Sequence, residues 1–210
     1  MKRILIADDH AIIRQGLKQI IEDSGDMRVV AEADSGIDAL RKIREVDCDV
    51  VMLDISMPDI SGIDVFKQIH AEKPQLPILI LSIYPEDQYA TRLIKAGAAG
   101  YMTKESAPAE VVKALLRVAG GKKYISPAVA EMLADELGTD EEKLPHQILS
   151  DREYQIFLLL ASAKTVSEIA DTLALSVKTV STYRSRILDK MHLSNNAELM
   201  RYAVDNHLSQ

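Results

Sequence analysis

The sequence has little that points to a membrane, a disulfide or a sulfur-based metal site. Its 210 residues include one cysteine, Cys48, which excludes an intrachain disulfide and a metal site built from cysteines. The five histidines are scattered, and no two stand at the spacing of ligands on one helix. No apolar run approaches the ~18 residues of a membrane span, and the apolar start stops too early for a signal peptide. We therefore expect a cytoplasmic protein that has no membrane partner.

Charge is distributed unevenly along the chain. The formal net charge of −7 argues against a protein that coats nucleic acid without selectivity. Residues 124–147 contain one lysine and six acidic residues, a net charge of −5, whereas residues 148–210 contain seven residues of each sign. Within that last part, residues 177–191 contain four basic residues and one acidic residue, a net charge of +3. This short segment is the place to look for contacts with a negatively charged partner.

Short apolar runs alternate with amphipathic segments over the first 120 residues. The runs carry Ile, Val and Leu at successive positions, as strands that are buried on both faces do. The predicted strands are Ile4–Ala7, Val29–Ala33, Val50–Leu53, Pro77–Leu81 and Gly100–Met102. The predicted helices are Ala11–Glu22, Gly36–Arg44, Gly62–Ile69, Asp87–Lys95 and Pro108–Ala119. This alternation predicts an α/β fold with a doubly wound, five-stranded parallel sheet and right-handed crossovers.

The rest of the chain is patterned as helix alone. Ser126 can cap a short helix over Pro127–Leu137, and the acidic, aperiodic residues 138–147 form the predicted linker. Four further helices are expected over Asp151–Ser162, Val166–Leu173, Val177–Met191 and Asn196–His207. Their N-cap candidates include Ser150, Thr165 and Ser176, the first two within capping boxes. Because three residues separate the second and third helices, we predict a small all-α domain with a helix-turn-helix.

Chemically useful side chains follow four of the five predicted strands. In an open parallel sheet, ligands bind beyond the carboxyl ends of the strands. The residues at these ends are Asp8, Asp9, Asp54, Ser82 and Lys104. Three adjacent carboxylates repel one another, and Mg²⁺, which binds carboxylates, waters and phosphate oxygens, relieves that repulsion. The lysine and the hydroxyl would hold the remaining oxygens of a phosphoryl group, so the pattern predicts aspartyl-phosphate chemistry.

Each of these residues also has a structural interpretation when it is taken alone. An aspartate after a strand is often a turn residue or a helix N-cap, and a lone lysine is usually solvated. The functional interpretation is preferred because five suitable residues fall at four strand ends on the same side of the sheet. We interpret Cys48 and His10 as structural or incidental.

Residues 1–120 resemble the receiver domain of response regulators. The resemblance is carried by Ile6–His10, by Val51–Pro58 with Gly62, by Leu81 and Ser82, and by Ala96–Lys104. It implies a flavodoxin-like fold in which Asp54 accepts a phosphoryl group. The donor would be a phosphohistidine on a sensor histidine kinase or a phosphotransfer domain.

The same resemblance assigns roles to the neighbouring residues. Asp9, Asp54 and the Ser56 carbonyl would bind Mg²⁺, and Asp8 would act largely through water. Lys104, Ser82 and Tyr101 would complete the site, the last two as the switch pair whose reorientation reports phosphorylation. Glu105 stands where many receivers have proline, which removes a cis peptide bond as an element of the switch.

The helix predicted over Val177–Met191 has an apolar stripe and a polar face. The stripe, interpreted as plain core, consists of Val180, Tyr183, Ile187 and Met191. A charged outer face is usually only solvated, but the second helix of a helix-turn-helix enters the major groove of DNA. The candidates for base contacts are Ser181, Thr182 and Ser185, and those for phosphate contacts are Lys178, Thr179, Arg186 and Lys190.

This last part resembles the LuxR-type DNA-binding domain. The matching segments are Leu149–Glu153, Val166–Ala170, Leu175 with Ser176, Lys178–Val180 and Ile187–Met191. The two resemblances together imply a NarL/LuxR-type two-component response regulator, most similar to the GacA/UvrY global regulators. They imply a receiver over residues 1–121, a linker with a short helix over 122–147 and a DNA-binding domain over 148–210. They also imply a transcription regulator rather than an enzyme, with double-stranded DNA as partner and a homodimer when phosphorylated.

Two other classes of protein use part of the same pattern. An Asp-nucleophile phosphohydrolase needs a second aspartate two residues after the nucleophile, where this sequence has Ser56. Steady phosphate release from a generic phosphoester would favour that class. A helix-turn-helix regulator with an unphosphorylated receiver is expected to lack Asp9, Asp54 or Lys104, and all three are present. The absence of an acid-labile phosphoprotein would favour that second alternative.

Overall fold

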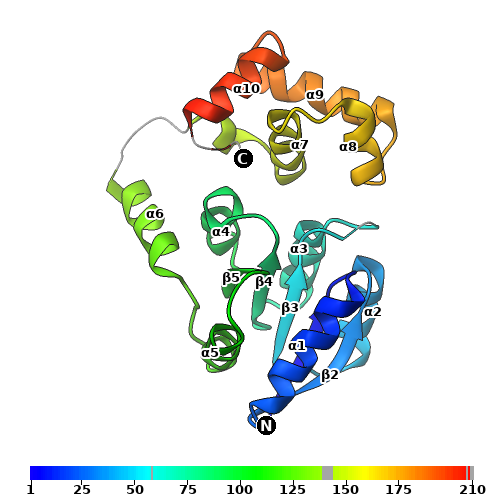
Figure 1. Cartoon of the computed structure of the whole chain (residues 1–210), viewed down its shortest axis with the longest axis vertical. Coiled ribbons are helices and arrows are strands. Elements are labelled where there is room, and N and C mark those ends of the chain that lie inside the picture. Colours follow the sequence, from blue (N-terminus) through cyan, green and yellow to red (C-terminus); the bar gives the residue numbers. More distant parts are fainter. Residues whose placement is uncertain (58, 139–143, 207, 209–210) are drawn as a thin grey trace. The chain divides into compact units, whose positions relative to one another are not determined.

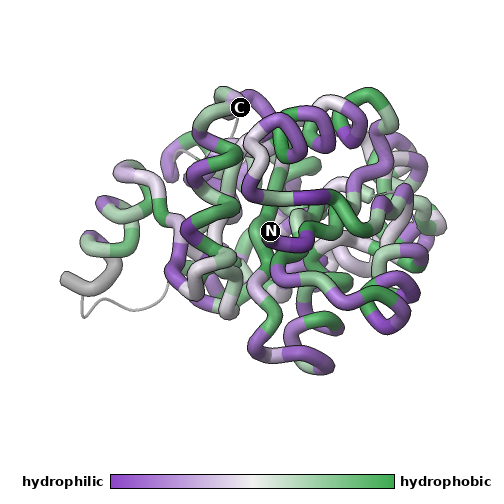
Figure 2. Tube along the Cα trace, turned by 90° about the horizontal axis from the view of Figure 1, so that it is seen from below, coloured by the Kyte–Doolittle hydropathy of each residue, from purple (hydrophilic) through white to green (hydrophobic). Residues whose placement is uncertain are grey.

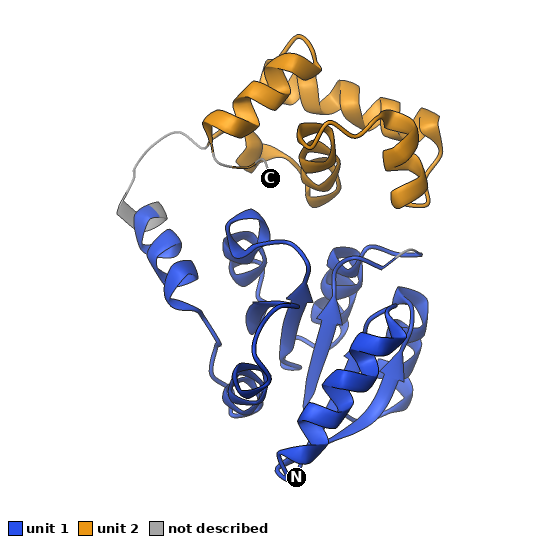
Figure 3. Cartoon of the chain, viewed as in Figure 1, with its two compact units in different colours: residues 1–138 blue, residues 139–210 orange. Residues whose placement is uncertain are grey.

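The structure, a computed structural model, describes residues 1–57, 59–138, 144–206 and 208. Contacts divide the chain into two compact units, Met1–Gly138 and Thr139–Gln210 (Figure 3). The first unit contains a β-sheet with helices and the second is helical (Figure 1). Within the described residues, no helix is long and apolar enough to span a membrane.

The first unit is built on a sheet in which all five strands are parallel. The strands are β1 (Lys2–Ala7), β2 (Met27–Ala33), β3 (Val50–Asp54), β4 (Ile78–Ser82) and β5 (Gly100–Thr103). Their order in the sheet is β2-β1-β3-β4-β5, so the direction of winding reverses between β1 and β3. The predicted doubly wound sheet is confirmed, and every strand limit lies within two residues of its predicted position.

Helices cover both faces of this sheet. They are α1 (Ala11–Asp23), α2 (Gly36–Glu45), α3 (Gly62–Glu72), α4 (Glu86–Lys95) and α5 (Pro108–Ala119), and a further helix, α6 (Pro127–Gly138), packs against α4. On one face, Ile4 and Ile6 of β1 pack with Leu17 of α1 and Leu115 of α5. Leu5, between them, is also fully buried, because the pleat turns it to the opposite face. Hydrophobic and hydrophilic residues are interleaved along each helix, as expected for helices that bury one face and expose the other (Figure 2).

The segment after α5 belongs to the first unit by its contacts. Tyr124 forms an isolated parallel bridge with Gly100 at the start of β5. The predicted cap is present, since Ser126 Oγ accepts a hydrogen bond from Val129 N at 3.2 Å. The same hydroxyl donates to Glu86 Oε2 at 2.7 Å, and α6 packs against α4. The sequence predicted this helix but gave no sign that it rests on α4.

The second unit is a cluster of short helices, and its four α-helices start where predicted and end within two residues of the predicted limits. They are a 3₁₀ turn over Pro145–Ile148, α7 (Asp151–Ala161), α8 (Val166–Thr172), α9 (Val177–Met191) and α10 (Asn196–Asp205). The predicted capping boxes begin α7 and α8, and Ser176 caps α9. Between α8 and α9, Ala174 adopts a left-handed φ of 50°, which makes the turn tight. The 3₁₀ turn falls in the predicted linker; of that linker, residues 139–143 lie outside the described residues, as does His207, the predicted end of α10.

Candidate functional site

The carboxyl ends of β1, β3 and β5 bring two buried aspartates and a lysine together. Ala7 of β1 pairs with Leu53 of β3, which places the residues that follow, Asp8 and Asp54, side by side. Lys104 Nζ lies 2.7 Å from Asp8 Oδ2 and 2.7 Å from Asp54 Oδ2. Both aspartates are 1% exposed, and the lysine side chain is 6% exposed. The predicted convergence of these three residues is therefore present in the fold.

Burial governs the electrostatics of this cluster. Burial raises the pKa of Asp54, and the contacts with Lys104 and with Ser56 N only partly oppose that rise. Burial alone would lower the pKa of Lys104, but the two carboxylates beside it raise the pKa above its ordinary value. Lys104 is thus held as a cation. With Asp9 included, three carboxylates face one ammonium, a formal charge of −2.

The donor set fits a divalent cation. Asp8, Asp9, His10 and Asp54 each offer one ligand atom, and these atoms lie within 4.8 Å of one another. Asp8 Oδ2, Asp9 Oδ1 and Ser56 Oγ are fully buried oxygens, and the first two are contacted by Lys104 Nζ at 2.7 Å and by His10 Nδ1 at 2.8 Å. All three belong to this cluster, in which one ammonium serves three carboxylates, and a further cation would stabilise buried carboxylate oxygens of this kind. Ser56 N donates to Asp54 Oδ1 at 2.9 Å, which places the next peptide group beside the cluster.

The predicted switch residues lie next to this cluster and are joined through Tyr84. Ser82 is buried, and its Oγ accepts a hydrogen bond from Tyr84 N at 3.0 Å. Tyr101 points inward, and its hydroxyl donates to the Tyr84 carbonyl at 2.8 Å. Burial raises the pKa of Tyr84, and the charge of Asp54 raises it further. The described residues contain no cis peptide bond, so Glu105 follows Lys104 in the trans form.

The outer face of α9 is polar and accessible, as the helical pattern predicts. Thr179 is only half-buried, and the exposed residues on this face are Lys178, Ser181, Thr182, Ser185 and Arg186. Thr182 Oγ1 donates to the Lys178 carbonyl at 3.0 Å, and Ser185 Oγ donates to the Ser181 carbonyl at 3.2 Å. These hydroxyls keep their lone pairs free to accept hydrogen bonds. Val180, Ile187 and Met191 are buried as predicted, whereas Tyr183 is only half-buried.

Both units match known families. Residues 4–116 match the family model for the response regulator receiver domain. Residues 147–203 match that for bacterial regulatory proteins of the luxR family. The chain belongs to the LuxR-type response regulators. It is therefore a two-component response regulator with a receiver domain and a LuxR-type DNA-binding domain.

Relatives span nearly the whole regulator. The response regulator GacA of Pseudomonas viridiflava is 40% identical over 97% of this chain and 96% of its own length. UvrY of Escherichia coli K12 is 36% identical over 97% of this chain and 94% of its own length. Among solved structures, RcsB of Salmonella enterica serovar Typhimurium, bound to promoter rprA with phosphomimetic BeF3−, is 26% identical. That match has a TM-score of 0.67 and covers 96% of this chain and 98% of RcsB.

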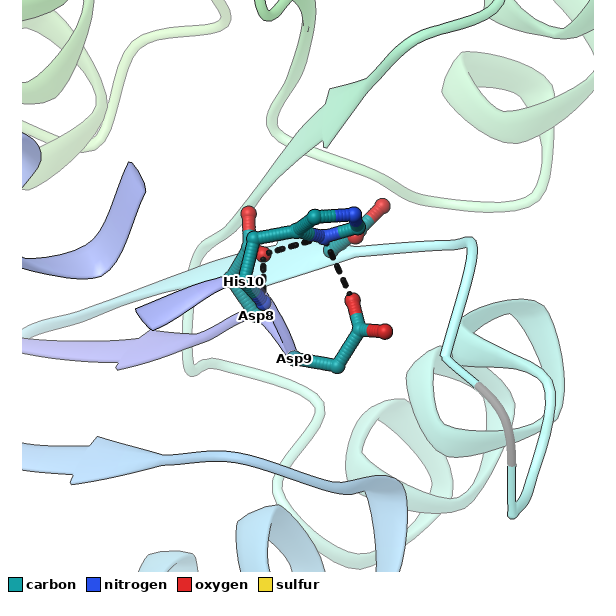
Figure 4. Close-up of side chains that lie close together, drawn as sticks. Asp8, Asp9 and His10 are labelled. Carbon is teal, nitrogen blue, oxygen red and sulfur yellow. Dashed lines mark hydrogen bonds and ion pairs between the residues drawn. The ribbon is translucent and has the colours of Figure 1, made fainter. Parts of the chain in front are cut away.

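Some groups at the regulator's two sites were not anticipated from the sequence. The sequence gives His10 a structural or incidental role, yet its Nδ1 lies 2.8 Å from Asp9 Oδ1 and 3.2 Å from Asp8 Oδ1 (Figure 4). Arg14 Nη1 donates to the Asp8 carbonyl at 2.6 Å. The adjacency of His10 to two aspartates was the available signal. Cys48, also set aside, is partly buried, and burial raises the pKa of its thiol to about 11.

Lys190, a predicted phosphate contact of the regulator, is engaged within its own unit. Its Nζ lies 2.7 Å from Glu153 Oε2, and Glu153 is buried at the start of α7. Burial would raise the pKa of Glu153, but Lys190 and the Ser150 cap lower it below its ordinary value. Arg184 is similarly occupied, because its Nε donates to Asn196 Oδ1 of α10 at 2.6 Å. The positive charge that α9 presents without a partner in its own unit is therefore smaller than its number of basic residues indicates.

Proposed function

We propose that this response regulator accepts a phosphoryl group on Asp54 from a phosphohistidine of a sensor histidine kinase or phosphotransfer domain. The modification would control dimerisation and the regulation of transcription from DNA that α9 contacts. The observation that supports the proposal best is the buried Asp54 carboxylate, which shares Lys104 with Asp8 at the reversal point of the sheet. In doubly wound sheets, that point is where ligands bind.

The residues around Asp54 are arranged for transfer. Asp54 Oδ1 is oriented by Ser56 N and Oδ2 by Lys104 Nζ, so one carboxylate oxygen can attack the phosphorus atom in a fixed direction. A new O–P bond forms as the N–P bond to the donor imidazole breaks. Asp8, Asp9, Asp54 and the Ser56 carbonyl would hold Mg²⁺, which would neutralise charge on the phosphoryl oxygens. The net charge of −2 in the cluster matches that ion.

The switch would begin at Ser82. A phosphoryl group on Asp54 offers acceptors to Ser82 Oγ, which now accepts from Tyr84 N. Tyr84 also holds the hydroxyl of Tyr101, so a displacement of Ser82 is transmitted to Tyr101 and to the surface around α4. The free energy must come from contacts made only in the phosphorylated state. We propose that the altered surface favours a homodimer.

The DNA-binding part of the proposal assigns two kinds of contact on α9. Phosphate contacts are assigned to Lys178, Thr179, Arg186 and Lys190, the last one weakened by its ion pair with Glu153. Base contacts are assigned to Ser181, Thr182 and Ser185. The solved complex of RcsB with a promoter supports DNA as the partner. The proposal also includes a role as regulator rather than enzyme and a cytoplasmic location. Its domain limits are 1–121 for the receiver, 122–147 for the linker and 148–210 for the DNA-binding domain.

Phosphorylation is tested by incubating the protein with Mg²⁺ and acetyl phosphate and measuring its intact mass. The wild type is expected to gain one phosphoryl group, and Asp54→Asn none. Asp64→Asn, an exposed carboxylate on α3, is the matched control and is expected to be labelled like the wild type. A chelator is expected to abolish labelling. Undiminished labelling of Asp54→Asn would refute the assignment.

The DNA contacts are tested by titrations at several salt concentrations on matched and scrambled sites. Lys178→Ala is expected to weaken binding to all sequences alike and to reduce the salt slope by ~1. Thr182→Ala is expected to relax discrimination at particular base pairs, each worth roughly 1–3 kcal/mol. Arg201→Ala, exposed on α10, is the control for a lost positive charge. The opposite pattern for Lys178 and Thr182 would reverse the assignment.

A further inference from the structure

His10 is held against the aspartates of the phosphorylation site by its own backbone. Its N–H donates to Asp8 Oδ1 at 2.8 Å, and the residue stands at the N-cap of α1 in an extended conformation. Arg14 on the next turn of α1 fixes the Asp8 carbonyl. The imidazole therefore starts from a Cα whose position relative to the carboxylates is fixed. Its side chain is 54% exposed, so an ion held there could exchange with solvent.

The imidazole of His10 faces two carboxylate oxygens of the cluster. Nδ1 lies 2.8 Å from Asp9 Oδ1, a contact within ion-pair distance. On its other side, Nδ1 lies 3.2 Å from Asp8 Oδ1 (Figure 4). The nitrogen therefore stands between two carboxylate oxygens. This is the arrangement of atoms that share a cation.

The spacing of these atoms fits neighbouring positions around a six-coordinate ion. With bonds of about 2.1 Å, adjacent ligands in an octahedral site stand about 3.0 Å apart. The two distances from His10 Nδ1 lie on either side of that value. Asp54 offers a further atom within the same 4.8 Å set, which includes Asp8, Asp9 and His10. Four side chains thus offer one nitrogen and three oxygens within 4.8 Å of one another.

We propose that His10 Nδ1 is a metal ligand of the phosphorylation site and shifts its preference from Mg²⁺ toward Mn²⁺ and the later first-row dications. This inference rests on the proposed function, because it names the cation class of that site. Mg²⁺ favours oxygen donors, whereas affinity for nitrogen donors rises from Mn²⁺ along the first row. The all-oxygen set of Asp8, Asp9, Asp54 and the Ser56 carbonyl serves Mg²⁺ without His10. With the imidazole added, the site holds transition-metal ions more tightly than those oxygens alone would.

The test uses Mn²⁺ as the probe on the full chain. Electron paramagnetic resonance of free Mn²⁺ gives its Kd, competition gives the Kd of Mg²⁺, and pulsed spectra reveal a directly bound ¹⁴N nucleus. The wild type is expected to show imidazole nitrogen coupling. In His10→Asn, which keeps a good N-cap, that coupling is expected to vanish, and the Mn²⁺ affinity to fall by ~10-fold or more. The Mg²⁺ affinity is expected to change far less.

Two further variants make each outcome decisive. His192→Asn replaces an exposed histidine whose left-handed φ of 56° suits asparagine, and it is expected to match the wild type in all three measurements. Asp9→Asn is expected to lower the affinity of the protein for both Mn²⁺ and Mg²⁺. The role of His10 would be overturned if Mn²⁺ bound through Asp9 but showed no nitrogen coupling, or if the coupling survived in His10→Asn. Either result would leave the proposed function intact. Bound Mn²⁺ that is indifferent to Asp9→Asn and Asp54→Asn would instead contradict the cation site of the proposed function.

Discussion

Replacing Lys104 by methionine should destabilise the receiver unit strongly, because it leaves two buried carboxylates without their cation. Nζ lies 2.7 Å from both Asp8 and Asp54, whose side chains are 1% and 0% exposed. Removing one partner of a buried ion pair typically costs ~3–5 kcal/mol. Domains are stable by only ~5–15 kcal/mol in total, so the loss is a large fraction. We expect a cost in the ~3–5 kcal/mol range at pH 7.5 in the absence of divalent ions.

The cost should depend on pH with a defined sign. The pKa of folded Asp54 is raised above the ordinary value of 3.8, so the folded state keeps its proton where the unfolded state has lost it. The free energy of unfolding therefore falls as the pH rises from the unfolded toward the folded pKa. In Lys104→Met no lysine opposes the effect of burial, so the pKa of folded Asp54 rises further. The pH range over which the stability falls then extends to higher pH. The difference between variant and wild type should thus shrink as the pH is lowered from 7.5 to 5.

Urea unfolding followed by circular dichroism measures this effect in the full chain. The DNA-binding unit lacks the cluster and serves as an internal reference. Lys113→Met, which removes an exposed lysine paired with Glu110 on α5, is the matched control and should cost less than ~0.5 kcal/mol. Adding Asp8→Asn to Lys104→Met should recover part of the loss. An unchanged midpoint for Lys104→Met at pH 7.5, or a cost that grows toward pH 5, would refute the reasoning.

The remaining predictions concern two glycines in the receiver unit and one glutamate in the DNA-binding unit. Gly62→Ala should destabilise the receiver by ~1–3 kcal/mol and slow phosphorylation, because a Cβ there would lie 2.0 Å from the Asp54 carbonyl oxygen. Gly16→Ala, with nothing within 4 Å of the added carbon, should stabilise α1 by up to ~1 kcal/mol in the same urea titration. Glu153→Ala should destabilise the DNA-binding unit by ~1–3 kcal/mol in thermal melts, since it removes a capping box and the ion pair with Lys190. Because the pKa of Glu153 is lowered, its contribution is present above the ordinary value of 4.5 and should disappear as the pH falls through the folded pKa. A Glu153→Ala melt equal to that of the wild type at pH 7 would contradict the role of this residue.

Features set by local periodicity were predictable. Strands buried on both faces leave unbroken apolar runs, and the caps at Ser150, Thr165 and Ser176 are read directly from the residues that follow them. The meeting of Asp8, Asp54 and Lys104 also followed, because parallel strands place their carboxyl ends at one edge.

Features that depend on pairing between distant side chains were not predictable. The helical pattern puts Lys190 on an exposed flank of α9, but its partner Glu153 lies 37 positions earlier in the chain. The hydrogen bond from Ser126 to Glu86, which ties the start of α6 to α4, spans 40 positions. The direction of the His10 side chain is not predictable for another reason, since a residue at a helix start has many rotamers and the surrounding carboxylates decide among them.

DNA affinity of the intact chain before and after phosphorylation tests the central claim most directly. Wild type and Asp54→Asn are titrated with a target duplex at one fixed salt concentration, each with and without acetyl phosphate and Mg²⁺. Coupling between two sites is typically worth a factor of about 5–150 in affinity. We predict a gain of that order for the wild type and none for Asp54→Asn. Equal affinities of the phosphorylated and unphosphorylated wild type, or an equal gain in Asp54→Asn, would contradict the account.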